Sequence, residues 1–493
     1  MKKTYQVTLP GMGVVQAKPG QNLLELLHER ALAPDAPCGG KGACGKCKVW
    51  IDGVEALACR TVIDRNMTVE PIASTSAVIL SSSTGVFQQA DEDVTGNLIA
   101  IDLGTTTMVC YLLDASGKEL GVASALNPQR GYGADVVTRI QKALEGKLDA
   151  LCAQVREGLS ALIWQVCAKA GVAPASVQRI ALVANPCMQQ LLMGISPVNL
   201  SKVPFAPVLT ERKTIPAKDL FPICPNAEFL VVPDISGYVG ADTLGCVLST
   251  GMYREEKITL MVDIGTNGEM VLGNSRHMLA CSTAAGPALE GANIRFGMRG
   301  SVGAIDHVDF VERKPQVHVI GGGKAKGICG SGLIDAVAGM LEAGLLNFRG
   351  RILSEDAEVD GERVFYLTED IYLTQTDIRQ VQLAKGAIAA GIELMAKELV
   401  IPLEGINQVL LAGAFGNFIR AESACRIGLL PPVLLPKIRA VGNAAGSGAK
   451  LLCCSRGQQA LAGQLCKSIE FLELAALPEF QRSFGKHTHF PTP

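Results

Sequence analysis

Residues 98–111 carry the clearest fold signal of the chain. They read Leu98-Ile-Ala-Ile-Asp102-Leu-Gly104-Thr105-Thr106-Thr107-Met-Val-Cys-Tyr111. An apolar run, a glycine turn with hydroxyl side chains and a second apolar run predict a buried β-hairpin. Residues 260–272 repeat this pattern as Leu260-Met-Val-Asp263-Ile-Gly265-Thr266-Asn267-Gly268-Glu269-Met-Val-Leu272, about 160 residues later. Such an internal repeat predicts a duplicated α/β fold with two equivalent hairpins.

The residue types in these hairpins suit a phosphate chain. Backbone amides of the turns and threonine hydroxyls donate hydrogen bonds to phosphate oxygens, and each aspartate can accept hydrogen bonds from magnesium-bound water. Two hairpins that face each other across a cleft could therefore hold a nucleoside triphosphate. An ordinary turn is the alternative for a single copy, and the second copy favours nucleotide binding.

The hairpin pair resembles the superfamily of acetate and sugar kinases, heat-shock chaperones and actin, which has a duplicated, ribonuclease H-like α/β fold. Val409-Leu-Leu-Ala-Gly413-Ala-Phe415-Gly416-Asn417-Phe is similar to the adenosine motif of that superfamily. Gly327-Ile-Cys-Gly330-Ser-Gly332-Leu is similar to its connecting helix, whose glycines are expected to permit close packing at the interdomain hinge. The resemblance implies an actin-like ATPase with subdomains at 98–255 and 256–493.

The resemblance also implies the roles of particular residues. Asp102 and Asp263 would accept hydrogen bonds from magnesium-bound water. Glu269 and Glu290 are candidates for positioning the attacking water, with the alternative that each holds a helix or pairs with a basic residue. The residues expected to contact ATP are Gly104, Thr105, Thr106, Thr107, Gly265, Thr266, Asn267, Gly268, Gly413, Phe415, Gly416 and Asn417.

A second motif lies near the start of the chain, where Cys38, Cys44, Cys47 and Cys59 have the spacing C-x5-C-x2-C-x11-C. Four thiolates can bind an iron-sulfur cluster, and the glycines between the first three let the loop point amide hydrogens at the sulfurs. A structural zinc site is the alternative, although zinc sites usually pair two C-x2-4-C knuckles. The motif favours a [2Fe-2S] cluster.

The residues around the cysteines predict a small β-rich domain, with strands at 6–9, 14–17 and 48–52 and a helix at 22–31. This region resembles ferredoxins of the β-grasp fold, which implies a [2Fe-2S] ferredoxin-like domain at residues 1–75. His28, on the predicted helix, is expected at the surface. Residues 76–97 have few core-forming side chains and are expected to be a linker.

Composition limits the class of protein. The chain has 493 residues, of which 48% are hydrophobic and 19% charged, as in globular proteins of about three domains. Lys and Arg total 45 against 47 for Asp and Glu, so no overall field favours nucleic acid or an anionic membrane. The start has no apolar signal region, and no window of about 20 apolar residues could span a membrane, which predicts a cytoplasmic protein.

The combination of the two modules is similar to the ferredoxin-fused reductive activators of corrinoid proteins. Further segments that carry this resemblance are Ala184-Asn-Pro-Cys-Met-Gln, Val203-Pro-Phe-Ala-Pro, Ser236-Gly-Tyr-Val-Gly-Ala-Asp242, Cys281-Ser-Thr-Ala-Ala-Gly286-Pro-Ala-Leu-Glu290-Gly-Ala-Asn and Val441-Gly-Asn-Ala-Ala-Gly446. Better-known members carry an additional domain between ferredoxin and ATPase, whereas here only about 25 residues separate the two. The cluster and nucleotide motifs are unaffected by this difference.

The resemblance implies an activity, cofactors and partners. Such an activator transfers an electron from its [2Fe-2S] cluster to Co(II) of a corrinoid protein, which regenerates Co(I) for methyl transfer and depends on ATP and Mg2+. The implied partners are a corrinoid protein of a methyltransferase system and a reductase that supplies electrons; whether a homodimer acts is left open. The alternatives are an activator of a radical dehydratase, a nucleotide-dependent redox sensor or chaperone-like regulator, and a small-molecule kinase.

Overall fold

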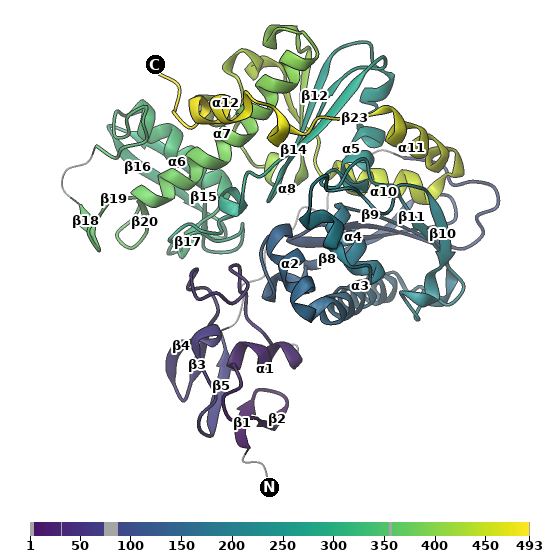
Figure 1. Cartoon of the computed structure of the whole chain (residues 1–493), viewed down its shortest axis with the longest axis horizontal. Coiled ribbons are helices and arrows are strands. Elements are labelled where there is room, and N and C mark those ends of the chain that lie inside the picture. Colours follow the sequence, from purple (N-terminus) through teal and green to yellow (C-terminus); the bar gives the residue numbers. More distant parts are fainter. Residues whose placement is uncertain (1–3, 31, 73–86, 354–356, 493) are drawn as a thin grey trace.

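The computed structural model describes residues 4–30, 32–72, 87–353 and 357–492, without the side chains of Pro71, Ala414 and Phe415. A small N-terminal body lies below two larger lobes that stand side by side (Figure 1). No helix within these described ranges is long and apolar enough to cross a membrane.

The N-terminal body is a five-stranded mixed sheet with one helix. Its strands, in spatial order, are β2 (Gly13–Ala17), β1 (Tyr5–Leu9), β5 (Met67–Pro71), β3 (Lys48–Ile51) and β4 (Val54–Leu57). Only β1 and β5 pair in parallel. Helix α1 (Leu23–Glu29) buries its four leucines in a core of its own. The predicted strands and helix are therefore confirmed, with ends that differ by at most two residues.

The first lobe is built on a six-stranded sheet. Its order is β10 (Lys213–Pro216), β11 (Glu228–Val231), β9 (Val177–Ala184), β6 (Asn97–Leu103), β7 (Thr107–Leu113) and β8 (Glu119–Leu126). One face of the sheet packs against helices α2 (Val136–Lys142), α3 (Leu148–Ala170) and α4 (Pro186–Met193). The other face packs against α5 (Ala241–Thr250) and a helix of the second lobe.

The second lobe repeats this sheet. Its order is β22 (Ile438–Ala440), β21 (Gln408–Ala412), β12 (Thr259–Ile264), β13 (Gly268–Gly273), β14 (Met278–Thr283) and β23 (Glu470–Phe471). The hairpin β12-β13 and its parallel neighbour β21 match the hairpin β6-β7 and its parallel neighbour β9. The duplication predicted from the repeated Asp-x-Gly-Thr pattern is therefore confirmed.

The rest of the second lobe surrounds this sheet. Its helices are α6 (Gly330–Glu342), α7 (Gln375–Glu398), α8 (Gly413–Gly416), α9 (Ala421–Arg426), α10 (Ala444–Cys454), α11 (Arg456–Ser468) and α12 (Phe480–His487). Its two small sheets consist of β15 (Ala304–Val311), β16 (Lys314–Val319) and β17 (Gly327–Ile328), and of β18 (Glu358–Val359), β19 (Glu362–Tyr366) and β20 (Tyr372–Thr374).

Helices α5 and α10 join the two lobes, because they share one core with the facing surfaces of both large sheets. They cross so closely that a Cβ at Gly448 would lie 2.2 Å from the carbonyl oxygen of Gly245. The glycines of α6 were expected to allow such packing at the hinge. Gly332 instead packs against β15 of its own lobe, where a Cβ would lie 2.4 Å from the carbonyl oxygen of Ile305.

The segment expected as a linker is only partly described, since residues 76–86 lie outside the described residues. Beyond them the chain packs against the first lobe: Ala90 and Val94 are buried in the core shared by the lobes. The backbone amide of Asp91 donates to the carbonyl of Cys454, and the Asp91 carboxylate pairs with Arg179. Residues 90–94 are therefore part of the ATPase-like fold rather than a free tether.

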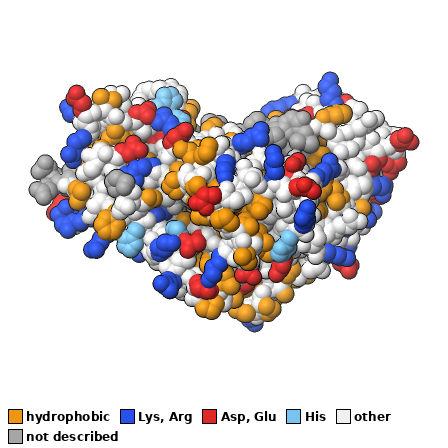
Figure 2. Space-filling view, turned by 90° about the horizontal axis from the view of Figure 1, so that it is seen from above, with side chains coloured by type: hydrophobic (Ala, Val, Ile, Leu, Met, Phe, Trp, Pro, Cys, Tyr) orange, Lys and Arg blue, Asp and Glu red, His pale blue; other side chains and the backbone are white. Residues whose placement is uncertain are grey.

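The surface that faces away from the N-terminal body carries basic and acidic side chains interspersed with apolar ones (Figure 2). This agrees with the near balance of 45 basic and 47 acidic residues in the chain. Neither positive nor negative charge dominates this face, so the face gives no indication of a polyanionic partner.

Candidate functional site

A cleft of about 450 Å³ lies between the two hairpins. Both hairpins line it, together with the beginnings of helices α5, α6 and α10 and the loop after residue 297. The predicted residues that line it are Asp102, Gly104, Thr105, Thr106, Thr107, Asp263, Gly265, Thr266, Asn267, Glu269, Glu290 and Gly413. The sequence repeat therefore located both walls of one cleft.

The turn of the first hairpin is held from behind by a buried arginine. Arg139 of α2, fully buried, donates to the backbone carbonyl of Thr105 over 2.6 Å. Asn127 donates to the carbonyl of Gly104, and Asn185 donates to the Thr105 hydroxyl over 3.0 Å. These donors occupy the carbonyls of Gly104 and Thr105 and so hold the turn in place from behind.

The turn of the second hairpin depends on a glycine from the neighbouring strand end. Gly413 follows β21, has a φ of +83° and lies beside Asp263. A Cβ at this position would stand 2.4 Å from Oδ1 of Asp263. The glycine thus supplies both the left-handed backbone conformation and the space that the Asp263 carboxylate occupies.

Glu290 connects the two hairpins across the cleft. Its Oε2 accepts a hydrogen bond from the Thr106 hydroxyl over 2.6 Å, and its Oε1 accepts one from the Thr266 hydroxyl over 2.8 Å. Neither alternative foreseen for this residue, a helix contact or a basic partner, describes these two bonds. Glu290 occupies a position from which the spacing of the hairpins can be set.

Several carboxylates crowd the cleft, and their proton affinities are raised. Burial raises the pKa of Asp102 to about 7, and the charge of Asp242 adds to this effect. Burial, followed by the charges of Asp242 and Asp102, raises the pKa of Asp263 to about 7. Burial raises the pKa of Asp242 to about 6 and that of Glu269 well above its usual range. A divalent cation between such groups would offset their repulsion and favour their ionised forms.

The adenosine-like segment contributes less than expected to the cleft. Gly413 and Phe418 line the cleft, whereas Gly416 and Asn417 are outside its lining, as is Gly268 of the second hairpin. The side chain of Phe415 is among the atoms that the structure does not describe. Asn417 is exposed at the start of the loop after α8.

Several lining residues were not assigned a role from the sequence. Asn443, the N-cap of α10, donates to Oδ2 of Asp102 over 2.9 Å. Asp242 stands at the first turn of α5, and Gly330 and Ser331 begin α6. Cys329, just before α6, also borders the cleft. The other lining residues without a prediction include Asn185, Met298, Arg299, Asp306 and Ile320.

The four cysteines of the N-terminal motif lie at one end of their domain and fall into two pairs. The Sγ atoms of Cys38 and Cys44 are 3.4 Å apart, and the thiols of Cys47 and Cys59 share a hydrogen bond. Burial alone would raise the pKa of Cys38, but hydrogen bonds from Cys44 and from the amides of Ala43 and Lys41 lower it to about 7. Within the described residues, no three or more His, Cys, Asp or Glu side chains gather around a single metal-ion position.

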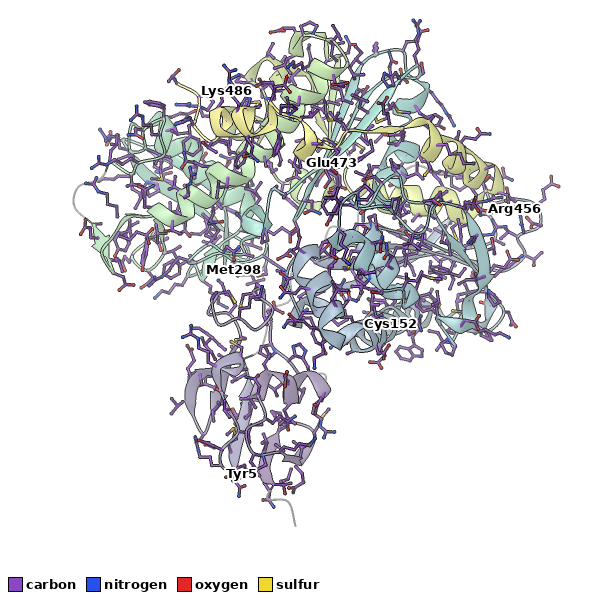
Figure 3. The ribbon with its side chains drawn as sticks, viewed as in Figure 1. Tyr5, Cys152, Met298, Arg456, Glu473 and Lys486 are labelled. Atoms are coloured by element: carbon purple, nitrogen blue, oxygen red, sulfur yellow. The ribbon has the colours of Figure 1, made fainter. Side chains whose placement is uncertain are left out.

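This cysteine end of the N-terminal body faces the mouth of the cleft. In Figure 3, Met298 marks the edge of the second lobe nearest the N-terminal body. Two backbone hydrogen bonds attach the body to the first lobe, from Ala36 to Arg130 and from Ala134 to Pro37. His28 stacks on Tyr132 with ring centroids 4.0 Å apart, so the prediction that it is a surface residue was wrong.

The duplicated sheets and the cleft between them define a protein of the actin-like class. Residues 257–493 match the family described as the C-terminal domain of RACo, the ASKHA domain, and residues 98–255 match the RACo middle region. The chain belongs to this family, the reductive activators of corrinoid proteins.

Curated relatives agree with these matches. The chain is 36% identical to the corrinoid activation enzyme RamQ of Eubacterium limosum over 416 residues, which cover 80% of this chain and 70% of the relative. It is 27% identical to the [Co(II) methylated amine-specific corrinoid protein] reductase of Methanosarcina barkeri, over 68% of this chain and 65% of the relative. A solved structure of a reductive activator for corrinoid,iron-sulfur protein superposes with a TM-score of 0.74 and 26% identity, covering 99% of this chain and 98% of that one.

Proposed function

We propose that this protein reduces the Co(II) form of a corrinoid protein to Co(I), in a reaction that requires ATP and Mg2+. The observation that carries the proposal is the position of the four-cysteine end of the N-terminal body at the mouth of the cleft, within one chain. A redox group bound there and a nucleotide bound in the cleft would act on each other at short range. The two named relatives, a corrinoid activation enzyme and a Co(II) corrinoid protein reductase, favour the same substrate.

The cleft has the chemistry that a magnesium nucleotide needs. Asp102 and Asp263 end equivalent strands and would accept hydrogen bonds from magnesium-bound water. The Thr105 hydroxyl and the turn amides that are not bonded within the hairpins would contact phosphate, while the hydroxyls of Thr106 and Thr266 stay on Glu290. Glu290 would hold the hairpins at one spacing, and Glu269 is the remaining candidate for positioning water. A ligand changes an equilibrium only through differential binding, so nucleotide contacts with both hairpins would favour one separation of the lobes.

The N-terminal body fits a [2Fe-2S] cluster held by Cys38, Cys44, Cys47 and Cys59. A mixed five-stranded sheet with one helix and a parallel central pair is the order of a β-grasp ferredoxin. The four thiolates supply the ligand set that two irons with two thiolates each require, and the Sγ atoms of Cys38 and Cys44 lie 3.4 Å apart. When bound, such a cluster supplies one electron at low potential. The glycine loop supplies amides directed at Cys38.

Reduction of Co(II) needs an electron at a potential below that of an ordinary plant-type cluster, roughly −400 mV. One electron passes to cobalt and ATP is hydrolysed to ADP and phosphate, so the unfavourable transfer is coupled to a favourable reaction. Membership of the corrinoid-activator family favours this function over the dehydratase activator, the sensor and the kinase. We propose cytoplasmic action together with a separate reductase as electron donor.

The test uses the full-length protein, reconstituted and reduced chemically under anaerobic conditions. A Co(II) corrinoid protein from the same cell is added, and its visible spectrum is followed with and without Mg-ATP. Co(I) should form only with Mg-ATP, and Asp263→Asn should abolish it. Asp149→Asn, an exposed change on α3 away from the cleft, should leave the rate unchanged.

Metal analysis of the same sample tests the cluster independently. The proposal requires two irons and two sulfides per chain. Stoichiometric zinc without sulfide would contradict it. Co(I) formation at the same rate without nucleotide would overturn the coupling to ATP.

A further inference from the structure

The cleft contains a single cationic side chain among the described residues that line it, and this side chain is Arg299. Six carboxylates share the same lining: Asp102, Asp242, Asp263, Glu269, Glu290 and Asp306. A triphosphate that enters so acidic a cleft needs positive charge beyond its magnesium ion. Arg139 lies behind the first hairpin, where it is fully buried and bonded to the carbonyl of Thr105. Arg299 is therefore the arginine placed to reach phosphate.

Arg299 has another anionic partner in the structure. Its Nη1 donates to Oδ2 of Asp35 over 3.1 Å, and Asp35 belongs to the N-terminal body just before the cysteine loop. The other oxygen of Asp35 accepts from Nε of Arg130 in the first lobe. All three side chains are partly shielded, with exposed fractions of 29% for Asp35, 23% for Arg130 and 30% for Arg299. One carboxylate thus links the N-terminal body to both lobes.

The second lobe contacts the cysteine loop at the same place. The Lys46 amine donates to the carbonyl of Gly297 over 3.2 Å, two residues before Arg299. The contacts with the first lobe are more numerous: the Ala36 and Ala134 amides, the Lys41–Gln141 hydrogen bond and the stacking of His28 on Tyr132. The residues around Arg299 are therefore the place where the second lobe contacts the N-terminal body beside the cysteine loop.

From this geometry we propose that Asp35 and the phosphates of the nucleotide compete for Arg299. Nucleotide binding draws Arg299 into the cleft, breaks its bond to Asp35 and frees the cysteine end of the N-terminal body from the second lobe. Because linkage is reciprocal, the Asp35 contact weakens nucleotide binding by the same factor by which nucleotide weakens the contact. The inference rests on the proposed nucleotide site and adds Arg299 to it as a phosphate-binding residue.

A double-mutant cycle in the full-length protein tests the competition. Affinity for the magnesium complex of a non-hydrolysable ATP analogue is measured by calorimetry in the wild type, Asp35→Asn, Arg299→Gln and the double variant. Asp35→Asn should bind the analogue at least fivefold more tightly, the lower end of typical coupling between sites. Arg299→Gln should bind it more weakly, and Asp35→Asn should then have no further effect. Asp64→Asn alters an exposed side chain of the same body and is the matched control, so this variant should bind the analogue as tightly as the wild type does.

Hydrogen exchange on the same samples reports the contact itself. Exchange within residues 38–47, beside the contacts with the second lobe, should accelerate when the analogue binds and in Asp35→Asn without it, whereas the amides of Ala36 and Ala134, which bond to the first lobe, should change much less. Amides of both hairpins should slow in every variant that binds the analogue. If Asp35→Asn tightens binding equally with and without Arg299, general charge repulsion explains the effect and the competition is overturned. Absence of any analogue binding to the wild type would overturn the proposed nucleotide site and this inference together.

Discussion

Glu290 is the residue whose contacts assign it the most specific role in the cleft. Because both of its oxygens accept threonine hydroxyls from opposite hairpins, we expect it to fix their spacing. Glu290→Gln can retain only part of this pairing, so kcat for ATP hydrolysis should fall by roughly 10²-fold, as for a misplaced reacting group. The KM for ATP should change much less. Steady-state phosphate release measures both quantities.

Thr266→Val, alone and combined with Glu290→Gln, distinguishes a spacing role from a direct contact with water. If Glu290 sets the spacing, Thr266→Val should lower kcat to a similar extent, and Glu290→Gln combined with Thr266→Val should be no worse than either change alone. A nearly active Thr266→Val protein would show instead that Glu290 acts on water without its threonine partners.

At the same scale, the sequence predicted the residues that lie within its repeated motif. Asp102, Asp263 and the turn threonines were found because the same short pattern occurs twice. Asp242 and Asn443 were not assigned, since each stands alone at the beginning of a helix and only the fold brings it to the cleft. Asp35 and Arg299 are separated by 264 positions, and no periodicity links a loop residue to a partner so distant.

At the scale of elements, the hairpins, the small N-terminal sheet and the duplication could all be predicted, because strand and turn patterns are local. The sequence did not predict that α10 packs against the sheet of the other lobe. This packing depends on contacts between residues far apart, such as the Cys453 thiol with the carbonyl of Ile99. The glycines of α6 illustrate the same limit: close packing was predicted correctly for this helix, but its partner was not.

The crossing of α5 and α10 can be tested with one added methyl group. Gly448→Ala would place a Cβ against the backbone of Gly245, where neither helix can move without disturbing the shared core. Overpacking of this kind costs about 1–3 kcal/mol, so the free energy of unfolding should fall by that amount and nucleotide affinity should fall as Asn443 shifts. Denaturant unfolding and calorimetry measure the two effects.

Gly463→Ala on α11 is the matched control, because a Cβ there would meet nothing within 4 Å. Alanine is favoured over glycine inside a helix, so this change should be neutral or stabilise the protein by roughly 0.5–1 kcal/mol. Equal destabilisation by both substitutions would show that the loss is a general response to glycine replacement rather than a property of the crossing.

At the scale of the whole molecule, the N-terminal body should dock less firmly in acid. Burial lowers the pKa of His28 to about 4, and the charges of Lys147 and Lys142 in the first lobe act in the same direction. Docking therefore favours the neutral imidazole. The favourable contribution of His28 to docking is complete above pH 6.5, the ordinary pKa of the imidazole. As the pH falls from 6.5 towards 4, this contribution is lost, and the docking equilibrium constant decreases by up to about tenfold per pH unit.

Small-angle X-ray scattering at pH 7.5 and pH 5 measures this change as an increase in the radius of gyration. His28→Phe keeps an aromatic ring against Tyr132 without a titrating group, so its radius should vary less between the two pH values. Because the glutamates nearest to this stack, Glu25 and Glu29, are retained in the variant, they cannot account for a difference between the two proteins. An identical pH response in His28→Phe would assign the transition to other groups. A smaller response would mean that one histidine, on the helix beside the cysteine loop, makes the placement of the four-cysteine end of the molecule sensitive to pH.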